Sequence, residues 1–380
     1  MSEVQSCSKI AHVEIDERGV GRRIAEARES RGWTQQDLAG STGIERSALA
    51  KIERGLRGIS ALELSAVAAA LDRRIEWFVL PQPEAVLQHR VRVGSSSDVA
   101  AIDQALERLA TDVSLLQDLD SSLAITVGRK PRPHSVDDVE ELAEYARDVC
   151  ALDRDSSVDD LARVVAGIGL YAFGLPLGVN TADGGLVPLQ VGAVAVVNSA
   201  SDVGRRRLTL AHELGHYLIA DDYTVDWRIA DLSGHVESLL DRFARIFLLP
   251  SAALERLWAK ETGDYSIRDR AVLAGGSFHV DMSTLARRLL ELELIDEQEA
   301  NVVRAARTLK ADIIEHGLRE PLDLGGVSLP PSIELSVLAQ YRRRRISAER
   351  AVLLLQGKYS FEDLPELPSG HPDEIWSILS

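Results

Sequence analysis

Apolar residues in the first 80 positions recur at helical spacing, in short blocks that turn residues separate. Thr34 and Ser60 are expected to cap two of these helices, because a side-chain oxygen at a helix start accepts a hydrogen bond from a free backbone N–H. Gly43 suits a left-handed turn between two others. The pattern predicts helices at 24–31, 35–41, 46–54, 61–71 and 73–80.

Beyond residue 80 the chain alternates between helical stretches and a few short strands. Apolar residues at helical spacing over 100–119 predict a helix that is either a connector or a dimerisation element. The β-branched and small residues that alternate over 191–197 predict a strand. The remaining elements of this stretch are expected as helices at 139–150, 158–168 and 236–250 and as a strand at 170–173.

The C-terminal part is expected to be helical throughout. Gly275 and Gly276 should interrupt one of its helical stretches, and the run Arg342–Arg345 separates the last two helices. This last pair resembles the small helix-turn-helix tails of antitoxin-like proteins, and a basic loop for contact with a partner protein is an equal alternative. The helical stretches are expected at 266–295, 301–317, 333–341 and 347–356.

The sequence therefore predicts a mainly α-helical protein with a small β-sheet, which is the α+β class. Pro81 and Pro83 disfavour helix, the run Gly94–Ser97 is typical of a flexible joint, and RKPRPHS at 129–135 is a further exposed break. These boundaries predict an N-terminal all-α domain (18–80), a linker with a connector helix (81–135), a central domain (136–300) and a helical C-terminal region (301–380).

Composition and charge narrow the class of protein. The 380 residues are 45% hydrophobic and 27% charged, and the net charge of −16 argues against binding of nucleic acid over the whole surface. The N-terminus has no apolar core segment, and the longest apolar runs fall short of the roughly 18–20 residues that a membrane helix needs. Cys7 and Cys150 form neither a disulfide nor a metal pattern. A cytoplasmic protein without membrane contact is therefore expected.

Residues 18–80 depart from the acidic balance of the chain, because they hold eleven Arg and Lys against eight Asp and Glu. Two short helices joined by a glycine turn, the second with small and basic residues, form a helix-turn-helix layout. The run Trp33–Gly55, WTQQDLAGSTGIERSALAKIERG, resembles the XRE (Cro/repressor-like) family. The matching positions are Gln35, Leu38, Ala39, Gly43, Ile44, Ile52, Glu53 and Gly55.

This resemblance implies that the helix at 46–54 enters the major groove of double-stranded DNA. Glu45 departs from the family's usual Ser, Thr or Asn, and a carboxylate at this place repels phosphate. Because the basic excess of the domain is small, useful affinity would need a homodimer or tandem sites. The alternative is a helical module for protein contact only. The resemblance places near base edges Arg46, Ser47, Ala50 and Lys51, and on phosphates Gln35 and Arg54.

The strongest chemical signal is the run Leu208–Leu218, LTLAHELGHYL. On a helix, His212 and His216 leave the same face, so that both imidazoles can bind one metal ion with Glu213 beside the water that the metal activates. The apolar neighbours predict a buried helix, and a core helix with two hydrogen-bonded histidines is the alternative. The three arginines at 205–207 are expected as a solvated approach to the helix or as a docking site for an acidic partner.

A catalytic site of this kind needs a third protein ligand and an open position for water. The residues alone leave this ligand open, although a carboxylate near the start of the helix at 236–250 would face the first helix, and acids directly after the histidines would fold back only with difficulty. Tyr217, Tyr223 and His235 are candidate oxyanion donors for which structural roles are the simpler interpretation. The candidate ligands are Asp221, Asp222, Asp226, Asp231, His235, Glu237 and Asp241.

The run RRRLTLAHELGHYL, followed by ExxxDRFARxFLLP, is similar to the ImmA/IrrE metallopeptidase family. The similarity covers roughly residues 136–300 and implies a zincin-like domain. Leu239 stands where many relatives have a second acidic or polar residue, which leaves Glu237 as the ligand. The other matching positions outside the first helix are Val197, Asn198, Asp241, Phe243, Ala244, Leu248 and Pro250.

The second resemblance implies metal-assisted peptide hydrolysis. One Zn²⁺ would be bound by His212, His216 and Glu237, and the same ligands suit Mn²⁺ and Fe²⁺. Glu213 would be the general base that takes a proton from water and passes it to the leaving amine. Without a metal, Glu237 would be an acid near a helix N-terminus, where the helix dipole favours it.

Three functions fit these residues. A DNA-binding zinc metalloendopeptidase would cut a partner regulator, as members of the second family cut helix-turn-helix repressors. A transcription regulator would use the metallopeptidase fold as a sensor or an interaction domain. An antitoxin-like DNA-binding protein would have a vestigial metal site, but the intact acid at Glu213 argues against this function, because a site for binding alone needs no general base.

Overall fold

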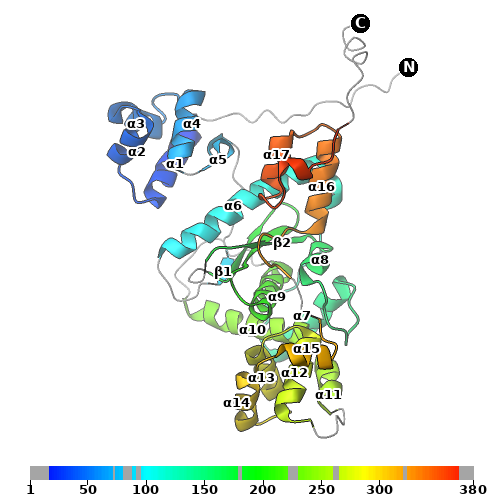
Figure 1. Ribbon diagram of the computed structural model, residues 1–380. Coiled ribbons are helices and arrows are strands. Elements are labelled where there is room, and N and C mark those ends of the chain that lie inside the picture. The colour runs from blue at the N-terminus through cyan, green and yellow to red at the C-terminus, as the bar shows by residue number, and fades with distance from the viewer. Residues whose placement is uncertain are drawn as a thin grey trace, which may run out of the picture. The chain divides into compact units, whose positions relative to one another are not determined.

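The computed structural model describes residues 17–71, 73–79, 88–90, 96–178, 182–220, 230–259, 265–319 and 323–367. The chain divides into two compact units, Met1–Glu84 and Ala85–Ser380, and each is described by itself. Helices dominate both units, and the described residues of the second unit include one four-stranded sheet (Figure 1). The predicted α+β class is confirmed.

The first unit is a bundle of short helices around one apolar core. Thr34 caps α2 by accepting from the backbone N–H of Asp37, and Ser60 caps α4 in the same way through Glu63, as predicted. The first helix begins before its predicted start at Ile24, because Val20 extends the same buried stripe. The helices are α1 (Glu17–Ser30), α2 (Gln35–Thr42), α3 (Arg46–Glu53), α4 (Ala61–Ala70) and α5 (Ile75–Val79).

The sheet of the second unit has the strand order β1-β3-β4-β2. β4 is buried along its whole length, pairs in parallel with β2 and lies antiparallel to β3, which in turn pairs antiparallel with β1. β1 and β3 were not predicted, because β1 falls in the predicted linker and β3 begins with two glycines. The strands are β1 (Gln88–Arg90), β2 (Leu170–Leu175), β3 (Gly184–Pro188) and β4 (Ala193–Asn198).

The long helix α6 (Ser96–Leu119) covers one face of this sheet (Figure 1). Its apolar stripe, which includes Leu106 and Leu109, is fully buried against side chains such as Phe173 and Val196 of the sheet. The stripe was predicted, but its role as a connector or dimerisation helix was wrong. The helix forms part of the core of the second unit, because its apolar face meets the apolar face of the sheet.

The C-terminal helices α16 (Pro331–Arg342) and α17 (Ala348–Leu354) pack into the same core. Arg350 pairs with Asp112 of α6 at 3.1 Å, and the Arg345 guanidinium donates to the backbone carbonyl of Leu119 at 3.1 Å. These arginines therefore attach the C-terminal helices to α6 within the second unit.

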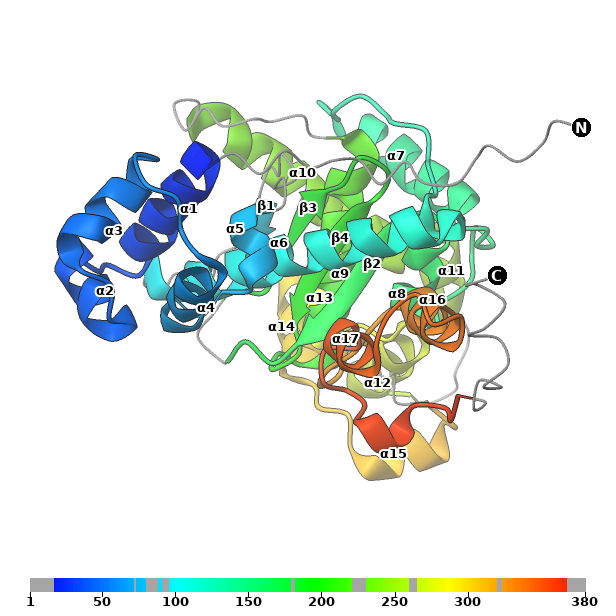
Figure 2. The ribbon, with the colours of Figure 1, turned by 90° about the horizontal axis from the view of Figure 1, so that it is seen from above.

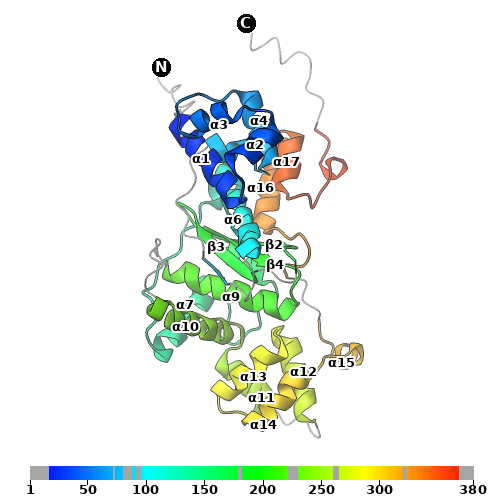
Figure 3. The ribbon, with the colours of Figure 1, turned by 90° about the vertical axis from the view of Figure 1, so that its left-hand side faces the viewer.

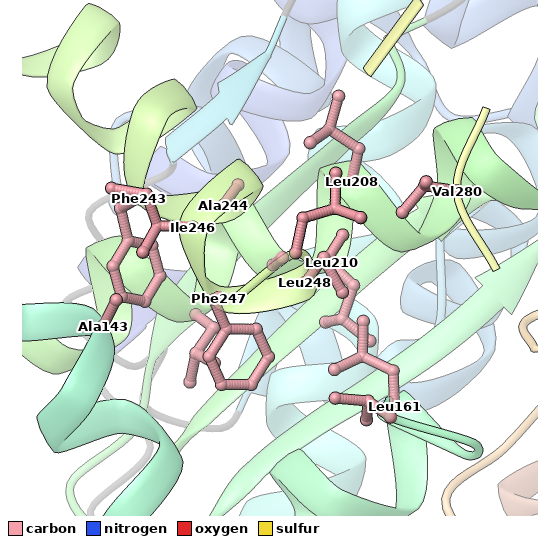
Figure 4. Close-up of a cluster of buried hydrophobic side chains, with 14 of the residues drawn as sticks. Ala143, Leu161, Leu208, Leu210, Phe243, Ala244, Ile246, Phe247, Leu248 and Val280 are labelled. Carbon is pink, nitrogen blue, oxygen red and sulfur yellow. The ribbon is translucent and has the colours of Figure 1, made fainter. Parts of the chain in front are cut away.

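The opposite face of the sheet is covered by α9 (Val203–Ile219), which lies against α10 (Ala230–Leu248) (Figure 3). Helices α7 (Val136–Val149) and α8 (Leu161–Ala166) complete this layer, with α10 packed against both α9 and α7. Figure 4 shows side chains of α9 and α10 meeting in this apolar cluster. Its labelled members include Leu208, Leu210, Phe243, Phe247 and Leu248.

A helical lobe follows α10. Gly275 and Gly276 lie inside α12 and do not interrupt it, because the chain turns only at His279, which has a φ of 56°. The helix predicted at 301–317 is divided in two. The lobe consists of α11 (Ser251–Ala259), α12 (Ile267–Phe278), α13 (Met282–Glu291), α14 (Glu297–Ala305) and α15 (Lys310–Glu315). Among the described residues, no helix combines the length and the apolar character that a membrane span requires.

Candidate metal centre

The helix α9 places its motif in the interior of the second unit. Thirteen of its seventeen residues are buried, because the sheet covers one side of the helix and α10 covers the other. His212, Glu213 and His216 are 2%, 1% and 6% exposed. Three ionisable side chains within five residues are thus withdrawn from water, which costs free energy unless the groups are paired or bind an ion.

The three arginines before the motif are engaged within the second unit, and Arg207 is not the solvated residue that was expected. Arg207 is fully buried and pairs with Asp323, which follows the helical lobe in the chain. Arg206 donates to the backbone carbonyl of Asp323 at 3.0 Å, and Arg205 pairs with Asp183 at 2.6 Å. The arginines therefore fix the N-terminal half of α9 to the surrounding chain.

Gly215, between the two histidines, allows α10 to approach α9 closely. A methyl group at Gly215 would lie 2.9 Å from Cδ1 of Phe243 and 3.0 Å from Cδ2 of Leu240. Only a hydrogen fits at this distance, and the close approach brings the polar face of α10 to the histidines. Glu237 and Asp241 are four residues apart on α10, so that both carboxylates face α9.

Three ligand atoms converge between the two helices. Nε2 of His212 lies 3.1 Å from Nε2 of His216 and 3.0 Å from Oε2 of Glu237. Nε2 of His216 lies 3.4 Å from Oε1 of Glu237. For a tetrahedral ion with bonds of about 2.0–2.2 Å, neighbouring ligand atoms are roughly 3.3–3.5 Å apart. The His-His-Glu cluster therefore fits one metal ion, and the donor types are those of a catalytic zinc site.

Asp241 lies on the side of His212 that faces away from Glu237. Its Oδ1 is 3.0 Å from Nδ1 of His212, the ring nitrogen opposite the one that faces Glu237. A carboxylate in this position fixes the ring and directs the lone pair of Nε2 toward an ion. The sequence named Asp241 only as a candidate ligand, and its position one turn after Glu237 is the signal that could have assigned this orienting role.

The carboxylates set the charge of the two imidazoles. Burial lowers the pKa of His212, but Asp241 and Glu237 outweigh it and raise the pKa to about 9. Burial lowers the pKa of His216. Burial would raise the pKa of Glu237, yet its hydrogen bonds with the two imidazoles hold it well below the usual range. The cluster thus favours positive charge beside ionised carboxylates, which a bound cation also satisfies.

The remaining residues of the predicted site divide into three groups. The Tyr217 hydroxyl donates to the backbone carbonyl of Ile168 at 2.7 Å, which is a structural role, and His235 is exposed. The side chain of Asp231 and all of residues 221–229 lie outside the described residues. That range includes the candidate oxyanion donor Tyr223 and the candidate ligands Asp221, Asp222 and Asp226.

Strand β3 lies next to Glu213, and the sequence did not predict this contact. A methyl group at Gly184 would lie 2.5 Å from Cγ2 of Thr209 and 3.8 Å from Oε1 of Glu213. The strand therefore runs in direct contact with α9 at the level of Glu213. This contact leaves no room for a side chain at Gly184.

In the first unit, α3 presents polar side chains outward. Leu49 and Ile52 are buried, and Arg46, Ser47 and Lys51 are exposed. Both residues that were predicted to contact phosphates form hydrogen bonds within the unit. Gln35 donates to Glu53 at 2.7 Å, and the exposed side chain of Arg54 donates to the carbonyl of Ala50 at 2.9 Å. The last of the predicted contact residues, Ala50, is half-buried.

Together these features define a DNA-binding protein with a metallopeptidase-like domain. Residues 24–78 match the family described as helix-turn-helix, and residues 169–290 match the family described as IrrE N-terminal-like domain. No curated protein and no solved structure matches the chain. The chain thus combines an XRE-type helix-turn-helix domain with an ImmA/IrrE-like domain, the fused architecture that the sequence predicted.

Proposed function

We propose that the protein is a DNA-binding zinc metalloendopeptidase that hydrolyses a peptide bond in a partner regulator. The observation that supports this function most directly is the convergence of His212, His216 and Glu237, with the buried acid Glu213 next to the first of them. A site that only stores or senses a metal gains nothing from a buried acid that is not a ligand. A hydrolase needs that acid for proton transfer.

The residues of the chain have distinct roles in this reaction. His212, His216 and Glu237 would hold the ion, and Asp241 would orient His212 through Nδ1. When bound, the ion supplies Lewis-acid chemistry that polarises the substrate carbonyl and makes water more acidic. The Glu213 carboxylate accepts a proton from the attacking water and donates it to the leaving amine.

A hollow opens beside Asp241 and would receive part of a bound substrate. It has a volume of about 650 Å³ and extends from Asp241 along α9 and α10 toward α13. Leu208 and Thr284 contribute to its wall. Its lining includes Asp241 but not the three candidate ligands or Glu213, so that it would receive a part of the peptide away from the scissile bond.

The first unit suggests the target. A peptidase that has its own DNA-binding domain would act on a protein that meets it on DNA, and a helix-turn-helix repressor is such a protein. The exposed basic residues Arg46 and Lys51 would contact double-stranded DNA, as a homodimer or on tandem sites because the basic excess is small. The same requirement favours a cytoplasmic location, with access to the chromosome.

The substitution Glu213→Gln tests the catalytic role. It keeps the shape of the side chain and removes the base, so cleavage should fall about 10²–10⁴-fold, with the metal content and DNA affinity unchanged. Cleavage is measured by mass spectrometry on helix-turn-helix regulators of the encoding genome, incubated with the zinc-loaded protein. A chelator-treated sample is the control for metal dependence.

The substitution Glu237→Ala tests the ligand set by metal analysis of the purified protein. Loss of one of three ligands should leave the variant largely free of zinc. Full zinc occupancy in this variant would show that another residue is the third ligand. If the wild-type protein leaves every regulator intact while Glu213→Gln regulates as wild type does in cells, the domain is a sensor and the proposed peptidase function is wrong.

A further inference from the structure

Strand β1 lies at the edge of the sheet, and among the described strands its partner is β3. Gln88, His89 and Arg90 are opposite Leu186, Gly185 and Gly184 in an antiparallel register. Figure 2 shows β1 beside β3. β1 is also the first described element after the first unit, which the chain leaves at residue 84.

The partner of β1 is the strand that borders the candidate metal centre. Gly184, which lies against Thr209 and close to Oε1 of Glu213, is the Cα partner of Arg90. The backbone of residues 88–90 therefore runs along the outer edge of β3 at the level of the catalytic acid. Any other extended chain that approached Glu213 along β3 would need the same row of backbone groups.

An open sheet edge offers unpaired N–H and C=O groups, and extended peptides bind such an edge by adding a strand. A peptide bond that is to be cleaved must be extended so that its carbonyl can reach the reacting centre. The edge of β3 is the row of backbone groups next to Glu213, and antiparallel pairing would hold a peptide in that extended form. In this chain the edge is occupied by β1.

We propose that residues 88–90 occupy, within the same chain, the sheet edge on which an extended segment of the protein substrate docks. The segment that follows the DNA-binding unit then acts as an internal competitor, and a substrate binds only after it displaces β1. The docking part of this inference stands on the strand pairing, and its inhibitory part rests on the proposed peptidase function.

Two matched triple variants of the full chain separate backbone pairing from side-chain effects. Proline at 88, 89 and 90 (Q88P/H89P/R90P) removes the N–H donors and destabilises an edge strand. Alanine at the same positions (Q88A/H89A/R90A) keeps every donor. Amide hydrogen exchange should show faster exchange in β3 for the proline variant only, with α9 unchanged as the control for folding.

The unfolded protein β-casein serves as the probe of the edge. In the proline variant with Glu213→Gln added, casein should restore the protection of the β3 amides from hydrogen exchange. In the wild-type protein, casein should leave the exchange of these amides unchanged. With zinc and an intact Glu213, the proline variant should hydrolyse casein at least ten times faster than wild type. The alanine variant should behave as wild type does.

A reversible crosslink checks the same point without proline. Gln88→Cys and Leu186→Cys stand at Cα partner positions, in a background without the two native cysteines. Oxidation should abolish the response of β3 to casein, and reduction should restore it. If casein never protects β3 after the proline substitution, the edge is not a docking surface and the inference is wrong. If protection returns without hydrolysis, the inference stands and the peptidase function fails.

Discussion

Helices α3 and α9 carry the two candidate functions of this protein in opposite ways. In α3, Leu49 and Ile52 are buried, and the polar side chains of Arg46, Ser47 and Lys51 are exposed on the other face. In α9 the buried residues include His212, Glu213 and Arg207, so that function and stability depend on the same interior. A substitution at an exposed position of α3 should therefore change binding alone, whereas most substitutions on α9 should change folding as well.

The largest loss of stability is expected at the buried ion pair between Arg207 of α9 and Asp323. Arg207→Met leaves Asp323 buried without its cation and should destabilise the second unit by about 3–5 kcal/mol. The matched control is Arg22→Met in α1, whose side chain is 72% exposed and lies 3.6 Å from Glu26. That change should stay within about 0.5 kcal/mol. Urea unfolding followed by circular dichroism measures both.

A double variant separates the charge from the packing. Replacing both partners, as Arg207→Met with Asp323→Leu, removes the unpaired charge and should recover most of the lost stability. If the single and double variants are equally unstable, the arginine contributes through its shape and its contact with the carbonyl of Val158, and the contrast between the two helices is weaker than stated.

An intermediate effect is expected at Asp241, which touches the metal centre only through His212. Asp241→Asn should lower zinc affinity about 10–100-fold, because an amide holds the imidazole less firmly than a carboxylate does. Ser238→Ala, at an exposed neighbouring position on α10, is the control and should keep full affinity. Competition with a chromophoric chelator measures the affinity. Equal affinities for Asp241→Asn and the wild type would remove Asp241 from the site.

The same contrast explains which parts could be predicted from the sequence. The first unit follows local rules, since caps such as Thr34 and Ser60 and the glycine at 43 act within a few residues of themselves. The pairing of His212 and His216 could be predicted because helical spacing alone places them on one face. Glu237 could be assigned only through family resemblance, because its distance from the histidines depends on how α10 packs.

Features that depend on distant packing could not be predicted. The burial of Arg207 requires Asp323, more than a hundred residues away, and nothing near RRR in the chain distinguishes a buried arginine from a solvated one. The strand at 184–188 was not predicted, because the reason for Gly184 is its contact with α9. The role of α6 was undetermined, because an apolar stripe does not show which surface covers it.

The smallest effect is expected on α3, where it should be confined to DNA binding. Lys51→Ala should weaken binding to nonspecific duplex DNA and lower the slope of log K against log salt by about 0.9, the loss of one phosphate contact. The stability of the first unit should change by less than about 0.5 kcal/mol, because the side chain is exposed. Fluorescence anisotropy over a salt series measures the slope, and urea unfolding measures the stability. Lys310→Ala, an exposed lysine of the second unit, changes the net charge equally and should leave the slope unchanged. Equal losses for the two lysine variants would mean that DNA senses only the overall charge and that α3 is not the contact surface.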